Sequence, residues 1–382
     1  MSLHELSDEQ REIRDLARRF ADEEIAPHAG AWDREHRFPR EVFTALGELG
    51  LMGVCVPAEH GGAGADFVSY MLVLEELSRA DAGVGVTVAV HTSAGTLPIL
   101  ANGTTEQVER LVPPLAQGHE LAAFALTESG SGSDAGAMRA RAADDGGGNG
   151  GVRISGTKQW ITNGSYAHTF TVFAKDPERP SAFVVRRGAA GFSVTREEEK
   201  MGLNSSSTAD LAFDGTPGER LGAPGAGMRV ALSTLDGGRI GIAAQALGIA
   251  QAALDVATAY AKERHAFGRP LGGFGVIQQK LADMQTEIEA ARALVWRAAR
   301  LKEAGHPQTV EGAQAKLFAS RVARHWTGEA IQILGGYGYT KEFPAERYYR
   351  DAKVTEIYEG TSEIQRLVIA RALLGEAARD TV

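Results

Sequence analysis

The pattern of apolar and polar positions changes twice along the chain and divides it into three zones. From Glu5 to about Gly118, apolar residues recur every three or four positions, which is the period of an amphipathic helix. Between about Leu121 and Arg229, short β-branched and aromatic runs alternate with turn residues, as in a series of strands. From Leu235 onward the helical period returns in long stripes with short joins, which is typical of a helix bundle.

These zones predict an α+β multidomain fold. We expect an N-terminal α-helical domain over residues 1–120, a middle antiparallel β-barrel or sandwich over residues 121–232, and a C-terminal α-helical bundle over residues 233–382. Antiparallel pairing is favoured in the middle zone because no helices separate its short strands.

Helix ends are marked by capping residues. Ser7 with Gln10 resembles a capping box at the start of the first helix. Ser362 with Gln365 predicts the start of the last helix, and Gly375 is placed to end it.

Two glycine-containing segments predict loops between strands. Asn163-Gly164 is a dipeptide typical of tight hairpins. The run DDGGGNGG at 144–151 predicts a flexible loop between two strands.

Composition and charge narrow the class of protein. The net charge of −9, with bases and acids interleaved, argues against a nucleic-acid partner, which would need an excess of Lys and Arg on one face. The longest apolar stretches, such as Ile240–Ala253, contain glutamines and predict no membrane span. The charged N-terminus lacks a signal-peptide core, so the expected compartment is the cytoplasm. The single Cys55 lies in an apolar run and is interpreted as a core residue.

Several catalytic signatures are absent from the sequence. It contains no Walker-type loop, no GxSxG elbow and no HExxH, and GSGSDAG at 130–136 has the wrong spacing for a Rossmann turn. A nucleophilic hydrolase and a zinc enzyme are therefore disfavoured, and no metal site is expected.

Five motifs carry residues suited to binding and chemistry. A glycine-rich turn lets backbone amides approach a polar ring, Trp160 with Thr162 can pack against a planar cofactor, and Arg264 can hold a pyrophosphate. Taken singly, each motif favours an ordinary loop, core residue, helix end or exposed carboxylate over a binding role. The motifs are FALTESGSGSDAG (124–136), KQWITNGS (158–165), ERHAFGRPL (263–271), QILGGYGY (332–339) and IYEGTSEIQRLVIARALLG (357–375).

Taken together and in this order, the five motifs resemble the acyl-CoA dehydrogenases, from about Ser7 to Gly375. The resemblance implies a C-terminal four-helix bundle, non-covalently bound FAD, a homotetramer, and electron transfer to an electron-transferring flavoprotein. It implies removal of the α-proton of an acyl-CoA and transfer of a β-hydride to flavin, giving a trans-2-enoyl-CoA.

The resemblance also implies roles for individual residues. Glu359 matches the catalytic base, its backbone amide matches a donor to the thioester oxygen, and Gly360 admits the thioester. Such a base needs a raised pKa, which burial beside Tyr358 and flavin would supply. The positions that match substrate contacts are Ser133, Ser206, Asp236, Arg239, Tyr358, Gly360 and Arg371.

The implied FAD contacts fall into groups along the chain. Those in the β zone lie along the flavin, Thr361 and Glu363 meet its adenosine part, and the 264–267 and 332–336 segments reach the FAD of a neighbouring subunit. The full set is Phe124, Leu126, Thr127, Ser133, Trp160, Ile161, Thr162, Arg264, Phe267, Gln332, Ile333, Leu334, Gly335, Gly336, Thr361 and Glu363.

The sequence departs from the family pattern at one flavin contact. Where members usually have a glutamine after an aromatic residue, this chain has Gly275 after Phe274, with Gln278 three positions later. The flavin contact is then lost, supplied by backbone, or made by a shifted residue.

Other readings remain on the same scaffold. They are an acyl-CoA oxidase, a dehydrogenase of a carrier-protein thioester, a DNA-binding relative, and a flavin-free homologue. No motif marks the floor of the acyl pocket, for which Val88, Leu97 and Leu235 are the candidates.

Overall fold

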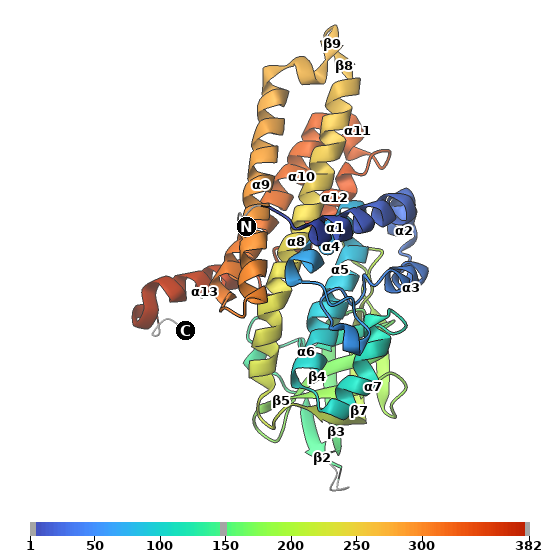
Figure 1. Cartoon of the computed structure of the whole chain (residues 1–382), viewed down its shortest axis with the longest axis vertical. Helices are drawn as coiled ribbons and strands as arrows, with labels where there is room; N and C mark the ends of the chain where they lie inside the picture. Colours follow the sequence, from blue (N-terminus) through green and yellow to red (C-terminus); the bar gives the residue numbers. More distant parts are fainter. Residues whose placement is uncertain (1–4, 146–150, 379–382) are drawn as a thin grey trace.

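The computed structural model describes residues 5–145 and 151–378, and its helices and strands follow the order α, β, α along the chain (Figure 1). The three-part architecture predicted from periodicity is therefore confirmed. Long helices of the C-terminal part run along the length of the molecule, and the sheet lies at one end of it (Figure 1).

The N-terminal part is helical, as its three- and four-residue spacing predicts. The predicted capping box is present: Ser7 accepts a hydrogen bond from Gln10 N at 3.1 Å, and the Gln10 side chain accepts one from Ser7 N at 3.0 Å. Its elements are α1 Asp8–Phe20, η1 Ala21–Ile25, α2 Ala26–Glu35, α3 Arg40–Glu48, η2 Ala58–His60, α4 Phe67–Ala80, α5 Ala82–Ala89, η3 Val90–Thr96, α6 Leu97–Asn102 and α7 Thr105–Ala116.

The C-terminal part is built around one long helix. That helix, α8, begins at Gly227, before residue 233 where we placed the start of the third domain. The elements are α8 Gly227–Glu263, β8 His265–Ala266, β9 Arg269–Pro270, η5 Leu271–Gly273, α9 Gly275–Glu303, α10 Thr309–Leu334, α11 Gly336–Tyr339, α12 Ala345–Val354, α13 Ser362–Leu374 and η6 Gly375–Ala378.

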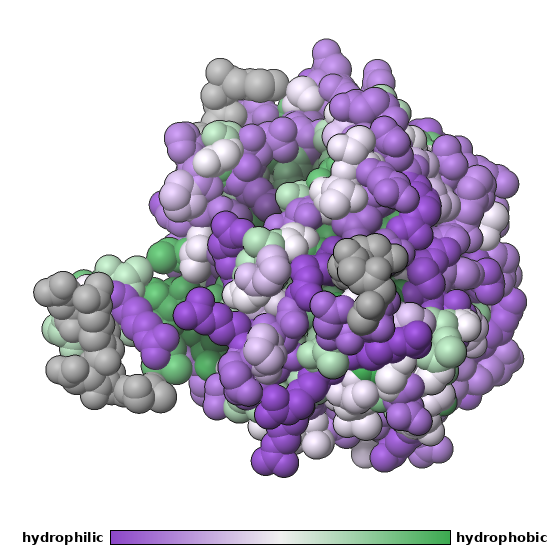
Figure 2. Space-filling view, turned by 90° about the horizontal axis from the view of Figure 1, so that it is seen from below, coloured by the Kyte–Doolittle hydropathy of each residue, from purple (hydrophilic) through white to green (hydrophobic). Residues whose placement is uncertain are grey.

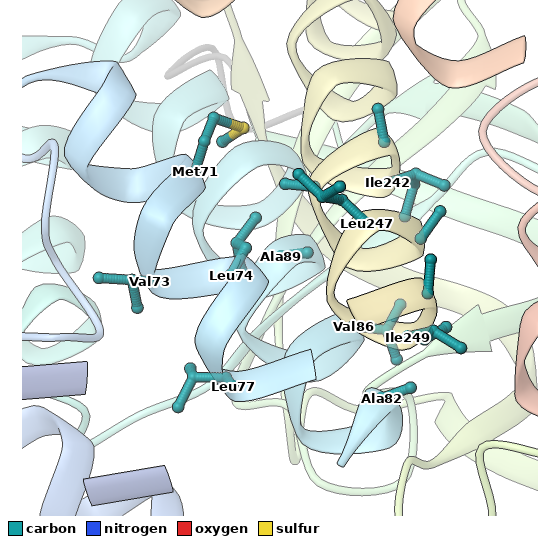
Figure 3. Close-up of a cluster of buried hydrophobic side chains, with 14 of the residues drawn as sticks. Met71, Val73, Leu74, Leu77, Ala82, Val86, Ala89, Ile242, Leu247 and Ile249 are labelled. Atoms are coloured by element: carbon teal, nitrogen blue, oxygen red, sulfur yellow. The ribbon is translucent and has the colours of Figure 1, made fainter. Parts of the chain in front are cut away.

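The two helical parts share one core. Leu74 and Leu77 of α4, Ile242 and Leu247 of α8 and Val86 of α5 belong to one buried cluster, in which Leu74 and Leu247 lie between the two long helices (Figure 3). All five side chains are at most 1% exposed. This packing fixes α8, and with it every residue that α8 contributes to the site, because close-packed interiors resist displacement.

The middle part is a β-barrel with a mixed strand pattern. Pairings β2–β3, β3–β7, β5–β7 and β4–β5 are antiparallel, whereas β1 and β2 both lie parallel to β4, and the β4–β5 pairing closes the ring. The parallel pairs were not predicted. The elements are β1 Ala122–Ala125, η4 Ala135–Ala137, β2 Arg141–Asp144, β3 Gly151–Thr162, β4 Thr169–Lys175, β5 Pro180–Arg186, β6 Phe192–Glu197 and β7 Thr208–Leu221.

Two local predictions need correction. Asn163-Gly164 forms a turn, with Asn163 at φ 66°, but it does not join a hairpin, because β3 pairs with β2 and β7 rather than with β4. The last helix is capped by Thr361 rather than by Ser362, since Thr361 accepts the hydrogen bond from Ile364 N.

The remaining loop prediction lies partly outside the described residues. It placed a flexible loop at 144–151, of which residues 146–150 are not described. At its two ends β2 and β3 pair antiparallel, with Asp144 opposite Val152.

Two helical stretches are long and apolar enough to cross a bilayer by length and composition, Ala82–Asn102 and Gly227–Glu263. In both, 83% of the apolar window is buried inside the protein, as expected of core helices. Cys55 also packs against the core, and burial raises the pKa of its thiol to about 12, so it is no nucleophile near neutral pH.

Candidate active site

Glu359 lies on a tight turn between α12 and α13. Its backbone has φ 53° and that of Gly360 has φ 90°, so two successive residues adopt the left-handed region. A non-glycine residue pays a steric cost there, and glycine does not. A Cβ on Gly360 would also lie 2.7 Å from the side-chain nitrogen of Gln365, so glycine is required at this position on two counts.

The carboxylate of Glu359 faces Gly238 of α8. An added Cβ at Gly238 would lie 2.6 Å from Glu359 Oε2, which shows how closely the acid approaches this helix. That oxygen is shielded from solvent and has no hydrogen-bond partner among the described residues. A buried carboxylate oxygen without a partner is unusual and indicates a group kept for a ligand or for catalysis.

Burial dominates the electrostatics of Glu359. It raises the pKa of the carboxyl to about 7, against the opposing effect of the positive charges of Lys316 and Arg239. A carboxyl that titrates near neutral pH is suited to take a proton from carbon, because its ionised form is both available and basic.

Tyr358 is held beside the acid by a buried amide. Its hydroxyl donates a hydrogen bond to Gln245 Oε1, and Gln245 Nε2 donates to Ala82 O at 2.8 Å. Burial raises the pKa of the Tyr358 hydroxyl, so the ring stays neutral. The bridge fixes the tyrosine against α8, and sequence reasoning missed Gln245 as its partner.

The two predicted flavin loops of the β-barrel lie side by side. Gln159 N donates a hydrogen bond to Thr127 O at 2.9 Å, which joins the loop after β1 to the end of β3. Trp160 sits at φ 58°, where the register of β3 against β7 shifts, and 58% of the residue is exposed. Ile161 is buried and Ser133 is exposed. The two loops therefore present the Trp160 ring and the Ser133 hydroxyl to solvent, whereas Ile161 packs inside the barrel.

A buried ion pair stiffens this region and was not predicted. Lys158 Nζ contacts Glu128 Oε1 at 2.8 Å and donates to Leu126 O at 2.9 Å. Glu128 also accepts backbone hydrogen bonds from Arg139 and Ala140. The available signal was one charged residue in each of the two predicted flavin segments, at positions 128 and 158.

The segments expected to reach a second flavin lie at the opposite end of the molecule. The tip between α8 and α9 carries Arg264 and Phe267, close to α11 and far from the barrel (Figure 1). Arg264 lies over the ring of Tyr337 at 5.7 Å, and Phe267 is 96% exposed. The exposed glycines Gly335 and Gly336 follow α10 at this end. Within one chain, the residues expected to contact a second FAD therefore lie apart from the barrel loops.

The residues expected near coenzyme A are scattered. Asp236 and Arg239 form an ion pair of 2.7 Å on α8, and Arg239 Nε is buried without a partner among the described residues. Ser206 is buried and accepts a hydrogen bond from Thr87 at 3.4 Å, so its hydroxyl faces the protein. Arg371 is exposed near the end of α13.

Helix α13, which follows Glu359, presents exposed side chains that could contact a ligand or a second chain. Thr361 caps it and Glu363 is exposed in its first turn. The helix leaves the body of the protein (Figure 1), and hydrophobic surface is visible along it and at its junction with the body (Figure 2). The exposed large apolar side chains on it are Leu367, Leu373 and Leu374.

Gly275, the departure from the expected pattern, is the first residue of α9. An added Cβ there would meet no atom within 4 Å, so a longer side chain would be sterically accepted. Gln278 donates its amide to Gly272 O at 2.8 Å and is engaged with its own chain.

Within residues 5–145 and 151–378, no three His, Cys, Asp or Glu side chains come together as a metal site. The lining of a surface hollow between α2, α8 and α12 includes Gly30, Arg34 and Arg347 and contains no residue of the Glu359 turn.

Comparisons with known proteins agree with this geometry. Models for the N-terminal, middle and C-terminal domains of acyl-CoA dehydrogenase match residues 7–119, 123–216 and 225–374. The short-chain specific acyl-CoA dehydrogenase of Bos taurus mitochondria is 49% identical over 97% of this chain and 91% of its own.

Solved structures resemble the chain equally well. Butyryl-CoA dehydrogenase from Megasphaera elsdenii has a TM-score of 0.94 at 43% identity, covering 97% of this chain and 99% of that one. A structure described as an electron transferring flavoprotein of Acidaminococcus fermentans has a TM-score of 0.96 at 44% identity, covering 98% and 100%.

Proposed function

The chain belongs to the acyl-CoA dehydrogenase family, and from this premise we propose its substrate class and the residues that act on it. It is an FAD-dependent oxidoreductase that dehydrogenates an acyl-CoA thioester. We propose a short-chain substrate of about the size of butyryl-CoA, because relatives at 49% and 43% identity bear short-chain and butyryl names.

One observation carries the proposal for the catalytic residue. Glu359 is the acid whose carboxylate oxygen is buried, partnerless and held on a left-handed turn against a glycine of α8. Its pKa of about 7 allows it to exist as a carboxylate and to take the α-proton of the thioester. Gly360 leaves room for the thioester beside it.

The backbone contributes to the same step. Removal of the α-proton places negative charge on the thioester oxygen, and an aimed N–H group stabilises such charge. In the described part of the chain, the Glu359 N–H has no hydrogen-bond acceptor, so it is available for this oxygen.

The residues present fit an FAD. Trp160 offers an exposed ring, the linked loops at 127 and 159 offer polar backbone, and Cβ atoms at Gly130 and Gly132 would meet only open space. Bound FAD would accept the hydride from the substrate β-carbon. We propose that Phe124, Leu126, Thr127, Ser133 and Trp160–Thr162 hold it from the barrel, with Thr361 and Glu363 at the start of α13.

Coenzyme A contacts are proposed for four members of the predicted set, Ser133, Asp236, Arg239 and Arg371. Asp236 and Arg239 lie on the same helix as Gly238, beside the acid, and Ser133 lies on the flavin loop. Arg371 on α13 completes the proposed set. Ser206 would need to turn its hydroxyl outward to join it.

The placement of the two groups of proposed FAD contacts at opposite ends of one chain supports an oligomer, and we propose the homotetramer that the family resemblance implies. We propose that Arg264, Phe267 and Gln332–Gly336 contact the FAD of a neighbouring subunit, since these residues are far from the barrel loops of their own chain. The exposed aromatic and leucine side chains at the tip and on α13 provide surface for such contacts. Electrons leave through an electron-transferring flavoprotein, as is typical of the family, and we propose a cytoplasmic location.

An anaerobic titration tests the substrate class. The purified yellow protein is mixed with acyl-CoAs from acetyl to palmitoyl length, and bleaching of the flavin band is followed. The proposal expects the highest ratio of bleaching rate to apparent Kd at four to six carbons. A maximum at long chains would contradict the short-chain proposal, and fast peroxide formation in air would instead indicate an oxidase.

A further inference from the structure

Helix α10 presents two buried polar side chains to the segment that carries Glu359. Lys316 is 1% exposed and Ser320 is fully buried, and they are four residues apart on one face of the helix. A buried lysine is rare unless it is paired, so its partners indicate its purpose.

The lysine binds backbone atoms at both ends of the catalytic turn. Lys316 Nζ donates to Gly360 O at 2.7 Å and to Thr355 O at 2.9 Å. Ser320 Oγ donates to the same Thr355 oxygen at 2.8 Å but is not a donor to Gly360. Lys316 therefore spans the segment from the end of α12 to the residue after Glu359.

Gln365 holds the same turn from the other side. Its Nε2 donates to Gly360 O at 2.7 Å and, more weakly, to Glu359 O at 3.4 Å. The left-handed conformations at Glu359 and Gly360 are thus fixed by two side chains from α10 and α13 that converge on one carbonyl. Strained backbone of this kind persists only where its surroundings impose it.

The surroundings of Lys316 Nζ stabilise a positive charge. Thr355 follows α12, where the unpaired carbonyls of the helix end carry partial negative charge. Burial lowers the pKa of Lys316 to about 8, while the carboxylates of Glu359, Glu356 and Glu363 oppose this shift and Arg239 adds to it. The charged form is therefore maintained near neutral pH.

Lys316 does not occupy the carboxylate itself. Glu359 Oε2 has no hydrogen-bond partner in the described part of the chain, and no ion pair joins the two side chains there. The lysine can thus fix the backbone below the acid and leave the acid free for a substrate proton.

We propose that Lys316 is a positioning residue for the dehydrogenation, which holds the Gly360 and Thr355 carbonyls and thereby aims Glu359 at the substrate α-carbon. This inference rests on the proposed role of Glu359 as the base. It adds a residue from a third helix, distant in sequence, to the machinery of the site.

Two substitutions separate position from charge. Lys316→Met removes the donors and the charge at similar volume, whereas Lys316→Arg keeps the charge but displaces the turn. In anaerobic stopped-flow mixing with butyryl-CoA, both should lower the rate of flavin bleaching, roughly 100-fold for Lys316→Met, because small misplacements of a catalytic group have effects of this size. The apparent Kd for butyryl-CoA should change less than about threefold for both, since the substrate contacts remain.

The pH profile distinguishes positioning from loss of structure. Lys316 and Arg239 are the cations that lower the pKa of Glu359, so Lys316→Met should move the kinetic pKa of the bleaching rate upward from about 7. Lys316→Arg should leave that pKa near the wild-type value while the rate stays low. Ser320→Ala, which removes only the second donor to Thr355, is the matched control and should bleach at close to the wild-type rate.

The outcomes are distinct from those of the proposed function. If the wild type bleaches and Glu359→Gln does not, the base is established. The inference about Lys316 would then be overturned if Lys316→Met binds FAD, bleaches at the wild-type rate and shows an unmoved kinetic pKa. Should Lys316→Met not fold, a wild-type bleaching rate in Lys316→Arg would overturn it instead. Failure of wild type to bleach with any acyl-CoA would count against the proposed function, not against Lys316 alone.

Discussion

At the scale of single residues, the site depends on an acid whose Oε2 is shielded from solvent and has no hydrogen-bond partner among the described residues. The glycine after Glu359 and the glycine opposite it on α8 both make room, one for the turn and one for the carboxylate. The raised pKa follows from burial and is moderated by two cations, Lys316 and Arg239. Each of these features can be altered separately.

Glu359→Gln should abolish turnover while retaining FAD. The amide has the same shape but cannot accept the α-proton, and removal of a general base lowers rates by about 10²–10⁴-fold. Turnover and flavin absorbance measure the two effects. Glu356→Gln, which alters a nearby carboxylate paired with Arg324 and Lys353, is the control and should stay active. Comparable activity of the two variants would refute the assignment of the base.

The pH dependence of kcat/KM should show one ascending limb near pH 7. The pKa of Glu359 is raised to about 7, so the carboxylate is protonated and inactive below this pH and becomes active as the pH rises through it. Steady-state rates between pH 5 and 9 measure the limb. A limb near pH 4.5, the ordinary value for Glu, would show that burial does not act on this group.

At the scale of elements, the site is assembled where three helices meet one turn. Helix α8 supplies Gly238, α10 supplies Lys316, and α13 begins directly after the acid. The conformation of the turn is restricted, because the helices around it are packed into the core. A change on the facing helix should therefore act on the acid.

Gly238→Ala should lower activity by roughly 10- to 100-fold without loss of the fold, because misplacing a catalytic group has effects of this order. The new Cβ would lie 2.6 Å from Glu359 Oε2, so the carboxylate must move. Gly241→Ala on the same helix is the control, since its Cβ would meet Leu74 at 3.4 Å and no part of Glu359. Turnover and thermal melting separate the effects, and equal activity of both variants would contradict the close approach.

Elements with a strong local signal were predictable, and long-range partners were not. The capping box at Ser7 and the stop at Gly375 follow from local chemistry and are present. The Asn163-Gly164 hairpin was wrong because strand order depends on contacts between distant strands. Lys316 escaped notice because a lysine in an apolar helical stripe says nothing about which distant carbonyl it binds.

At the scale of the whole molecule, the predicted three-part fold and family are confirmed, whereas the site assignments remain predictions. Motifs identified the right family because several matched in order. The motifs could not show how the two groups of FAD-contacting residues are arranged around a cofactor, since that depends on how the chains assemble. The separation of the 264–267 tip from the barrel loops is the observation on which the proposed cross-subunit contact to FAD rests (Figure 1).

Arg264→Ala should weaken FAD retention more than it weakens folding. Arg264 is exposed at the tip and makes no core contact, and its planar side chain can donate paired hydrogen bonds to a pyrophosphate. The flavin content after gel filtration and the thermal melting temperature of the apoprotein measure the two effects. Lys262→Ala, in the last turn of the same helix, is the control, and equal FAD retention in both variants would contradict the cross-subunit role.

The distance between the Glu359 turn and the 264–267 tip within one chain also has a genetic consequence. If each catalytic unit takes its acid from one polypeptide and its arginine from another, two inactive alleles can complement each other. Co-expressed Glu359→Gln and Arg264→Ala chains would form some mixed oligomers with one unit intact in both respects. A cell carrying both defective alleles would then regain part of the activity that either allele alone has lost.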